Sequence, residues 1–386
     1  MKDPAIIFLI PTGVVEYNAH MFKIPILSVF LIALLLSCTF VPPLSANPES
    51  PLSPSPTAPR EDIRILTINV WSGLTYKGFF KMGRHPDDPQ ERYELLVGEI
   101  RQLDPHVIAI QEANPLPEYA ERLAADLDYR AIYRVALGGI RFGPVGIPVN
   151  LREGDAILVK KPLIIEDLGR RRLSGSGIAT NWFCFQLGDA TQAIVGRVMI
   201  GGKPIYVYAV HLHSGPFHGP ALKESVERLA HEISKEEVER ARRGVERDVE
   251  QRRYELTTLM KYIEETLPTG MPAILLGDFN TPAESGELDR LLASGKWADT
   301  FRLKNPHDEG ATWDPSQNSN SRQRPGASTP YDLLCAHHER YSSRIDFICV
   351  NEAIPRDHIL ESRVVMTPVG GLSPSDHYGI FTVLRW

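Results

Sequence analysis

The sequence predicts an α+β protein in which β-sheets form a layered sandwich with helices on the outside. Three observations lead to this fold class. From residue 63 onward, short apolar runs alternate with amphipathic segments. Several of the runs are apolar on successive residues, as strands covered on both faces are. The chain also shows no internal repeat and no regular strand–helix–strand repeat, which argues against a purely parallel sheet.

Eight apolar runs are the strand candidates. In chain order they cover residues 63–70, 107–111, 156–160, 192–200, 204–213, 273–277, 345–350 and 379–385.

Three amphipathic stretches are expected to be helical. The first covers 90–103 and ends before Asp104-Pro105, and the second covers 116–127. The third, 220–267, begins with Pro and is balanced in charge, as a long solvated helix with i,i+4 pairs would be. Gly244 is expected to interrupt it. The polar stretch 314–330 is expected to be a long loop, and loops of that length are often functional.

The chain divides into a leader, a spacer and one large domain. Residues 1–46 are expected to be a signal peptide or a lipoprotein signal, because 26–38 is apolar and short for a membrane span. Met21 then becomes a candidate for the true start. Lipidation at Cys38 and ordinary cleavage after Ala46 both remain open. The protein is therefore expected to be exported: secreted, periplasmic, or tethered to a membrane as a lipoprotein.

The spacer covers 47–61 and is rich in Pro and Ser, a composition that does not bury a core. Residues 62–386 form the predicted catalytic domain. The formal net charge of −6 gives no electrostatic footprint for nucleic acid. Beyond the leader the chain has three cysteines, for which buried free thiols are expected. A bridge between Cys335 and Cys349 is the alternative.

Polar side chains gather at the ends of the predicted strands. Carboxylate and amide oxygens are ligands that Mg²⁺ accepts, and imidazoles transfer protons near neutral pH. Taken singly, each residue has an ordinary structural explanation. Their shared placement predicts a site for metal-assisted phosphodiester hydrolysis. The set consists of Asn69, Glu112, His211, His213, Asp278, Asn280, Asp346, Asp376 and His377.

The order of these stretches resembles that of the endonuclease/exonuclease/phosphatase superfamily. The matching stretches run from "LTINVW" to "SDHYGIF", with "QE" and "GDFN" between them, and cover essentially all of 62–386. The resemblance implies a four-layer α/β sandwich, with two packed mixed sheets flanked by helices. It also implies a metal-dependent phosphodiesterase or phosphatase.

The resemblance further implies a role for each residue. Glu112 would be the principal Mg²⁺ ligand, with Asn69 beside it and Asp376 as a further contact; Mn²⁺ or Ca²⁺ in place of Mg²⁺ remains open. The predicted catalytic residues are His377 as general base oriented by Asp346, His211 on the phosphoryl group, and Asp278 and Asn280 positioning nucleophile and phosphate. Which imidazole is the acid and which the base stays open.

Three stretches are similar to the neutral sphingomyelinase and phospholipase C-like branch. They are "NVW", "HLHSG" and "TWDPSQN", and they make Trp71, His213 and Trp313 the predicted substrate-binding residues. The expected substrate is a phospholipid or another phosphodiester, with association at a membrane surface and no obligate protein partner. The aromatic and basic stretch 76–83 is the candidate interfacial loop. Alternatives are a secreted nuclease, with nucleic acid as substrate, or an inositol or sugar phosphatase.

Overall fold

The computed structural model describes residues 8–10, 13–15, 62–71, 74–76, 82–84, 89–143, 145–147, 152–180, 182–186, 190–322 and 328–386. The chain divides into two compact units, Met1–Pro56 and Thr57–Trp386. The described part of the first unit is an antiparallel pair, β1 (Phe8–Ile10) and β2 (Gly13–Val15). The predicted signal core, Cys38 and the 47–61 spacer lie outside the described residues.

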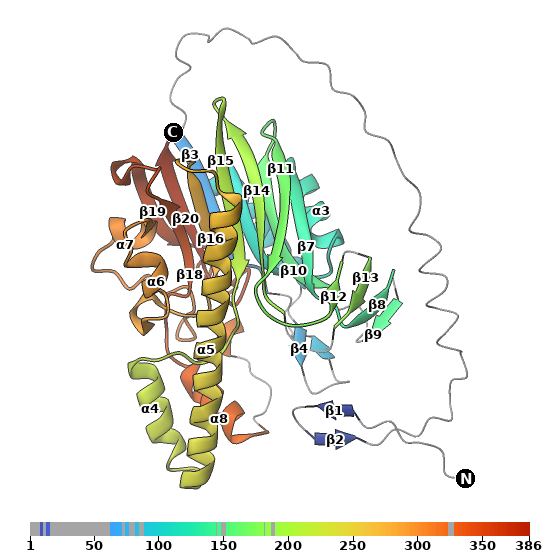
Figure 1. The fold of residues 1–386 in the computed structure, drawn as a ribbon, viewed down its shortest axis with the longest axis vertical. Coiled ribbons are helices and arrows are strands. Elements are labelled where there is room, and N and C mark those ends of the chain that lie inside the picture. The colour runs from blue at the N-terminus through green and yellow to red at the C-terminus, as the bar shows by residue number, and fades with distance from the viewer. Residues whose placement is uncertain are drawn as a thin grey trace. The chain divides into compact units, whose positions relative to one another are not determined.

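The second unit is built on two six-stranded sheets (Figure 1). The first sheet has the order β19 (Ile359–Val365), β20 (Gly379–Arg385), β3 (Asp62–Asn69), β6 (Val107–Ala113), β10 (Glu153–Lys160) and β7 (Tyr129–Leu137). The second has the order β11 (Ile165–Arg172), β14 (Gln192–Ile200), β15 (Lys203–His211), β16 (Ala273–Asp278), β18 (Asp346–Asn351) and β17 (Trp297–Asp299). In each sheet one central pair is parallel, β3 with β6 and β15 with β16, and the other pairs are antiparallel. The predicted mixed sheets are therefore confirmed.

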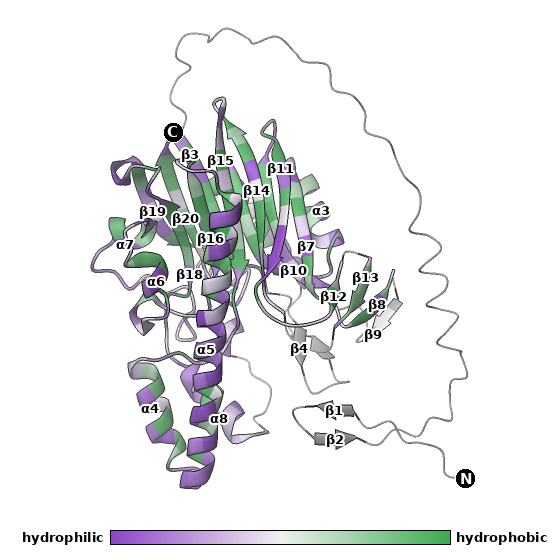
Figure 2. Cartoon of the chain, viewed as in Figure 1, coloured by the Kyte–Doolittle hydropathy of each residue, from purple (hydrophilic) through white to green (hydrophobic). Residues whose placement is uncertain are grey.

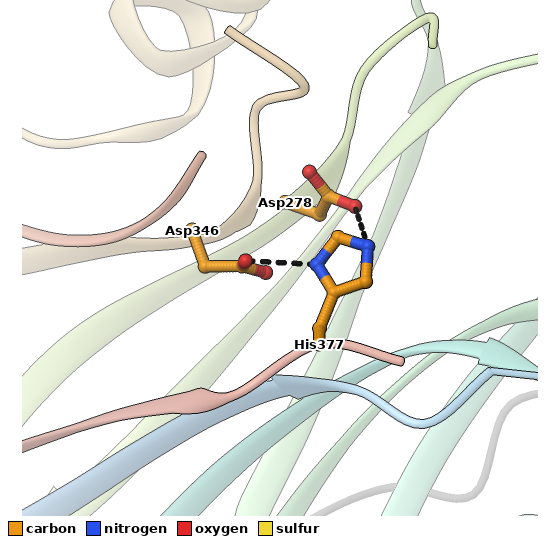
Figure 3. A group of neighbouring side chains, drawn as sticks. All are labelled: Asp278, Asp346 and His377. Carbon is orange, nitrogen blue, oxygen red and sulfur yellow. Dashed lines mark hydrogen bonds and ion pairs between the residues drawn. The ribbon is translucent and has the colours of Figure 1, made fainter. Parts of the chain in front are cut away.

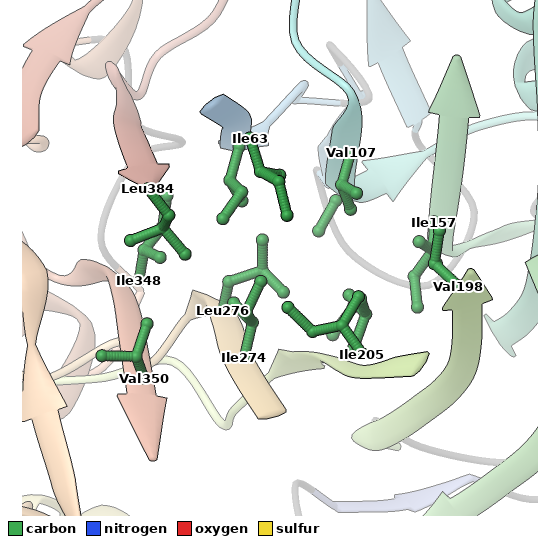
Figure 4. Close-up of a cluster of buried hydrophobic side chains, with 14 of the residues drawn as sticks. Ile63, Val107, Ile157, Val198, Ile205, Ile274, Leu276, Ile348, Val350 and Leu384 are labelled. Carbon is green, nitrogen blue, oxygen red and sulfur yellow. The ribbon is translucent and has the colours of Figure 1, made fainter. Parts of the chain in front are cut away.

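The two sheets pack face to face through a core of branched aliphatic side chains (Figure 4). Ile63 and Val107 come from the first sheet, and Ile205, Leu276 and Ile348 come from the second. Each is at most 1% exposed. Burying one such side chain stabilises a fold by roughly 1.5–3 kcal/mol, so this layer holds the sheets together.

Helices cover the outer face of each sheet. On the first sheet α2 (Pro89–Leu103) and α3 (Glu118–Leu127) bury Leu96, Ile100 and Leu123. On the second sheet the last turns of α5 (Lys235–Thr266) bury Leu259 and Ile263. The predicted four-layer α/β sandwich is confirmed, with its layers in the order helix, sheet, sheet, helix.

The predicted helix 220–267 is in fact two helices. α4 (Pro220–Leu229) ends, and α5 begins after Ser234, whose side chain forms a capping box with Glu237. The prediction that Gly244 interrupts the helix is wrong. Gly244 lies inside α5, where a Cβ atom would come within 2.2 Å of the Tyr331 ring, so the glycine makes room for α8 (Pro330–His338). The three helices share a fourth apolar cluster that includes Val245 and Leu334.

Several elements were not predicted. They include the short helices α6 (Asp289–Leu292) and α7 (Thr300–Lys304) and the pair β4 (Leu74–Tyr76) and β5 (Met82–Arg84). A separate four-stranded sheet has the order β12 (Ile178–Ala179), β13 (Phe183–Phe185), β8 (Ile140–Phe142) and β9 (Val145–Ile147). Figure 2 shows β13 largely in green, the colour of apolar residues.

Two smaller predictions are also decided. Cys184 and Cys349 are buried free thiols, as expected, whereas Cys335 is a free thiol that is only partly buried, and the alternative Cys335–Cys349 bridge is not formed. Among the helices of the described residues, none is both long enough and apolar enough to cross a membrane. Most of the candidate interfacial loop, 77–81, lies outside the described residues.

Candidate active site

Most of the predicted site residues meet at one edge of the sandwich, where parallel strands from both sheets end. β3 ends at Asn69, and β6 carries Glu112 one residue before its end. In the second sheet the register places His211 beside Asp278, and Asp278 beside Asp346. β18 runs antiparallel to β16, which explains why Asp346 opens its strand whereas the other residues close theirs.

Asn69 joins the two sheets at this edge. It is fully buried, and its Nδ2 donates to Glu112 Oε1 at 2.9 Å and to Asp278 Oδ2 at 3.1 Å. Its Oδ1 accepts a hydrogen bond from the main-chain N–H of Trp71 at 3.0 Å. Because a main-chain N–H bonds only to an acceptor, this contact fixes which way the amide points. Asn69 therefore orients two carboxylates, and its predicted role as a metal ligand stays a prediction.

The backbone is left-handed at three positions of the site. Trp71, Glu112 and Asn280 have φ values of 48°, 56° and 52°, although none of them is glycine. Such conformations are uncommon outside glycine and cluster at functional sites. Asn69 and Asp278 each accept a hydrogen bond from the main-chain N–H two residues later, Trp71 and Asn280, which holds two of these turns in place.

His377 lies between two aspartates (Figure 3). Its Nδ1 is 2.9 Å from Asp346 Oδ2, and its Nε2 is 3.8 Å from Asp278 Oδ2. The Trp313 ring packs edge-on against the imidazole, with the ring centroids 5.2 Å apart. The predicted pairing of Asp346 with His377 is thus present, and the aspartate fixes the orientation of the ring.

His211 lies on the other side of Asp278. Its Nε2 is 3.7 Å from Asp278 Oδ2 and 3.9 Å from Glu112 Oε1. The side chain is 23% exposed, whereas that of His377 is 6% exposed. Of the two imidazoles, His211 is therefore the one that a substrate reaches more easily.

The surrounding carboxylates control the titration of both rings. Burial alone would lower the pKa of His377, but Asp346 and Asp278 raise it well above its usual value. Burial likewise opposes protonation of His211, yet Asp278 and Glu112 raise the pKa of that ring. Burial, and then the nearby charge of Asp346, raises the pKa of Asp278. A divalent cation at this edge would act on both imidazoles in the opposite sense from the carboxylates.

The donor atoms fit a hard divalent cation. Glu112 and Asp278 present carboxylate oxygens that are held together by one amide, and such oxygens are the ligands Mg²⁺ prefers. Asp278, Asp346 and His377 can also each offer one ligand atom, all within 4.8 Å of one another. In that trio one Asp346 oxygen is bonded to the imidazole, and the other, Oδ1, is buried without a hydrogen-bond partner in the structure. Asp278 belongs to both groups of donors, and the role of Glu112 as the principal metal ligand stays a prediction.

The remaining predicted residues lie around this centre. Asn280 donates from Nδ2 to the Leu212 carbonyl at 2.8 Å. Arg92 lies over the Trp71 ring, 4.6 Å from its centroid. Asp376 is half-buried and accepts a hydrogen bond from Ser375. Its predicted role as a metal ligand stays a prediction.

The other two predicted substrate contacts are anchored in the protein. His213 follows the end of β15, and its ring is 3.1 Å from Asp248 of α5. Trp313 is 7% exposed, and its Nε1 donates to the Glu339 carbonyl. The structure does not bring His213 into the central cluster, and it gives Trp313 the position of a wall behind His377. Their binding of substrate stays a prediction.

Sequence reasoning missed one carboxylate of this site. Asp155 of β10 is 1% exposed; its Oδ2 accepts from Gln192 Nε2 at 2.8 Å, and its Oδ1 has no hydrogen-bond partner in the structure. Burial raises the pKa of Asp155 to about 6, although the charge of His211 opposes the shift. The signal was a single acid within the apolar run "GDAILV".

Several solved structures share this fold. TDP2 of Caenorhabditis elegans has a TM-score of 0.52 at 16% identity, over 84% of this chain and 75% of that one. A Bacteroides thetaiotaomicron protein of the endonuclease/exonuclease/phosphatase family has a TM-score of 0.52 at 15% identity, over 85% and 98%. D. rerio TDP2 complexed with a single-strand DNA product has a TM-score of 0.50 at 15% identity, over 84% and 99%.

The identities are low, so these structures show a shared fold and no more. No curated protein sequence matches the chain. The sequence itself matches the endonuclease/exonuclease/phosphatase family over residues 66–377, a span that contains all the site residues described above. With the sandwich and the strand-end site in place, that match shows that the chain belongs to the endonuclease/exonuclease/phosphatase family.

Proposed function

We propose that the chain is an exported, Mg²⁺-dependent phosphodiesterase of sphingomyelinase or phospholipase C type. Members of its family are hydrolases that act on phosphodiester bonds. The observation that carries the proposal is the meeting of Glu112, Asp278 and two imidazoles at one sheet edge. Export is supported by the apolar run 26–38.

In the proposed reaction each group acts at a stated atom. Asp346 holds Nδ1 of His377, which leaves Nε2 to take the proton of the attacking water. His211, partly exposed beside Glu112, holds a phosphoryl oxygen as an imidazolium. Glu112 and Asp278 would hold a Mg²⁺ ion, whose chemistry would be to neutralise the charge that develops on the phosphoryl oxygens.

The lipid branch is supported by features of both sequence and surface. Trp71 lies directly beside Asn69 in the "NVW" stretch, and Trp313 backs the catalytic histidine. The charge of −6 does not favour a polyanionic substrate. The competing function is a nuclease, which is supported by the similarity in fold to D. rerio TDP2, whose solved structure holds single-strand DNA product.

One experiment separates the two functions. The purified chain is offered sphingomyelin vesicles and plasmid DNA side by side, with Mg²⁺ or with EDTA. We expect Mg²⁺-dependent release of phosphocholine and intact DNA. Nicked DNA with untouched vesicles would replace the lipid proposal by the nuclease.

The variant His377→Ala tests the assignment of the active site in the same assay. Losing a general base typically costs 10²–10⁴-fold in rate, so we expect a loss of that order on whichever substrate is cleaved. Circular dichroism checks that the fold is kept. Wild-type rates from this variant would show that the site assignment is wrong.

A further inference from the structure

The small sheet formed by β12, β13, β8 and β9, here called the aromatic lobe, exposes an unusual amount of apolar surface. Of the eleven large hydrophobic side chains exposed in the described residues, six belong to this lobe or to its connecting turn. They are Ile140, Phe142, Ile178, Trp182, Phe183 and Phe185, with exposed fractions from 36% to 62%. Contiguous apolar patches on a soluble domain usually mark a binding surface.

Strand pairing places these side chains on one face. Phe183 lies opposite Phe142, Phe185 opposite Ile140, and Ile178 opposite Phe185. Directly opposed residues in an antiparallel pair point to the same side. The Trp182 ring packs on Phe142, with the centroids 4.2 Å apart, and extends that face.

The lobe reverses the usual arrangement of a surface sheet. Its inward face carries Arg141 and Cys184, which lie opposite each other in the register of β8 and β13 and are both buried. Arg141 donates to the carbonyls of Gly143 and Thr180 and so braces the lobe from within. The charged side chain of Arg141 therefore lies on the buried face, where its hydrogen bonds stabilise the lobe. The aromatic rings lie on the outer face, where their contact with water is unfavourable.

The charge pattern selects the kind of partner. Arg141 and Asp189 are the only charged residues in 138–151 and 173–191, in a chain that is 23% charged. A surface for anionic lipid or nucleic acid needs clustered Lys and Arg, which these stretches lack. The three arginines just before the second stretch, Arg170–Arg172, are held by hydrogen bonds to the protein itself, and Arg172 donates to the Gly177 carbonyl. Exposed Trp and Phe on an uncharged surface match the interfacial layer of a bilayer, where aromatic residues are enriched.

The lobe is fixed to the strands that carry the site. Gln186 donates to the Ala136 carbonyl of β7 and accepts from the main-chain N–H of Gly138. Beyond β9, strand β10 carries Asp155, and beyond β13, strand β14 begins at Gln192, whose register partner is His211. The aromatic lobe therefore adjoins the edge of the sandwich at which β10 and β14 begin (Figure 1).

We propose that the aromatic lobe docks the enzyme onto a zwitterionic phospholipid bilayer. This proposal rests on the proposed lipid phosphodiesterase function, because it supplies that site with a substrate that does not leave the membrane. Docking through uncharged rings makes binding insensitive to salt and independent of anionic lipid.

The test is co-sedimentation of the Thr57–Trp386 unit, which contains all four core clusters, with phosphatidylcholine vesicles. Omitting the leader removes its own apolar run from the measurement. Two variants are compared with wild type, the double change Phe142→Ala/Trp182→Ala and the single change Ile178→Glu. Tyr254→Ala, on α5 and 63% exposed, is the matched control.

We expect each lobe variant to lose at least about tenfold in vesicle partitioning, and Tyr254→Ala to bind as wild type does. Hydrolysis of the soluble diester bis(4-nitrophenyl) phosphate should be unchanged in all of them, which shows that the fold is kept. Wild-type binding by both lobe variants, or no binding by the wild type, overturns the proposal. So does a dimer in solution that Ile178→Glu dissociates, because the face would then be a self-association surface.

The two proposals fail in different ways. Lobe-dependent vesicle binding without release of phosphocholine leaves the docking surface standing and removes the proposed substrate. Release of phosphocholine by an enzyme whose vesicle binding does not depend on the lobe would support the proposed substrate and remove the docking surface.

Discussion

Asp155 shows at the scale of a single residue how this site combines function with a cost in stability. A carboxylate that is 1% exposed and has one oxygen without a hydrogen-bond partner is expensive to ionise. It persists beside His211, whose protonated form it helps to stabilise. The same trade-off is common in active sites, where groups are kept for charge placement at the expense of folding energy.

The substitution Asp155→Asn is expected to stabilise the protein at neutral pH. The pKa of Asp155 rises from an ordinary value of 3.8 to about 6, so between these values the folded state binds more protons than the unfolded state. Stability therefore falls as the pH rises through this window, and Asn removes the fall. At about 1.4 kcal/mol per pKa unit, the gain at pH 7 is up to about 3 kcal/mol.

Urea unfolding of both proteins in EDTA at pH 4, 5, 6 and 7 measures this effect. The difference in unfolding free energy should grow from near zero at pH 4 toward pH 7. Asp357→Asn, an exposed Asp on the surface, serves as the control. A constant difference across the whole range would contradict the assignment of the raised pKa to Asp155.

The residues of the centre could be predicted from sequence, but their hydrogen bonds could not. Glu112, His211 and Asp278 were found because polar residues at the ends of apolar strands stand out. The direction of the Asn69 amide depends on the main-chain N–H of Trp71, and therefore on a left-handed turn. That turn could not be predicted from sequence, because the residue with positive φ is a Trp and not a Gly. The contact between His213 and Asp248 crosses from a strand end to a helix 35 residues away.

At the scale of elements, α5 holds the segment that follows β15. Arg252 of α5 is fully buried and donates to both carboxylate oxygens of Glu287, at 2.8 and 3.1 Å. It also donates to the carbonyls of Gly215 and Pro216, just beyond His211 and His213. One guanidinium thus joins the helix, this loop and the segment after "GDFN".

Arg252→Met is expected to cost about 3–5 kcal/mol, because it leaves the Glu287 carboxylate buried without its cation. The double change Arg252→Met/Glu287→Leu should recover part of that loss, since no buried charge remains. Urea unfolding measures both. Arg302→Met, which breaks an ion pair with the exposed Glu284, should cost less than about 1 kcal/mol. An equally small loss for Arg252→Met would mean that the buried pair does not hold this loop.

Within the two six-stranded sheets, the strands that sequence reasoning missed share one property, which is a place at the edge of the sheet. β7, β11, β17 and β19 are edge strands, and "IEDLGRRR" of β11 has five charged residues in eight. Edge strands carry charges because one side has no neighbouring strand, so their sequences lack the apolar runs of central strands. The basic run Arg170–Arg172 lies in β11, where Arg171 pairs with Glu265.

At the scale of the whole molecule, sequence patterns were sufficient to predict the four layers of the sandwich. They were not sufficient to predict the small sheet that forms the aromatic lobe. The central strands of both sheets and the helices that cover the first sheet were predicted because each buries a recognisable apolar face. The aromatic lobe escaped prediction because its strands are two or three residues long, too short for a period to show. Its inverted face also lacks the polar outer positions by which a surface sheet is recognised.

The unit Thr57–Trp386 is expected to fold without the residues that precede it. All four apolar clusters lie within it, and a unit with its own core is able to fold alone. We expect its urea m-value to match that of the full chain and its Tm to lie within about 2 °C of that of the full chain.

The contrasting truncation starts at residue 71 and removes β3, which pairs with both β20 and β6 at the centre of the first sheet. That protein should not unfold cooperatively, because five buried residues of its two largest clusters would be missing, namely Ile63, Ile65, Leu66, Ile68 and Val70. A Tm well below that of the full chain for Thr57–Trp386 would show instead that the leader contributes to the native fold.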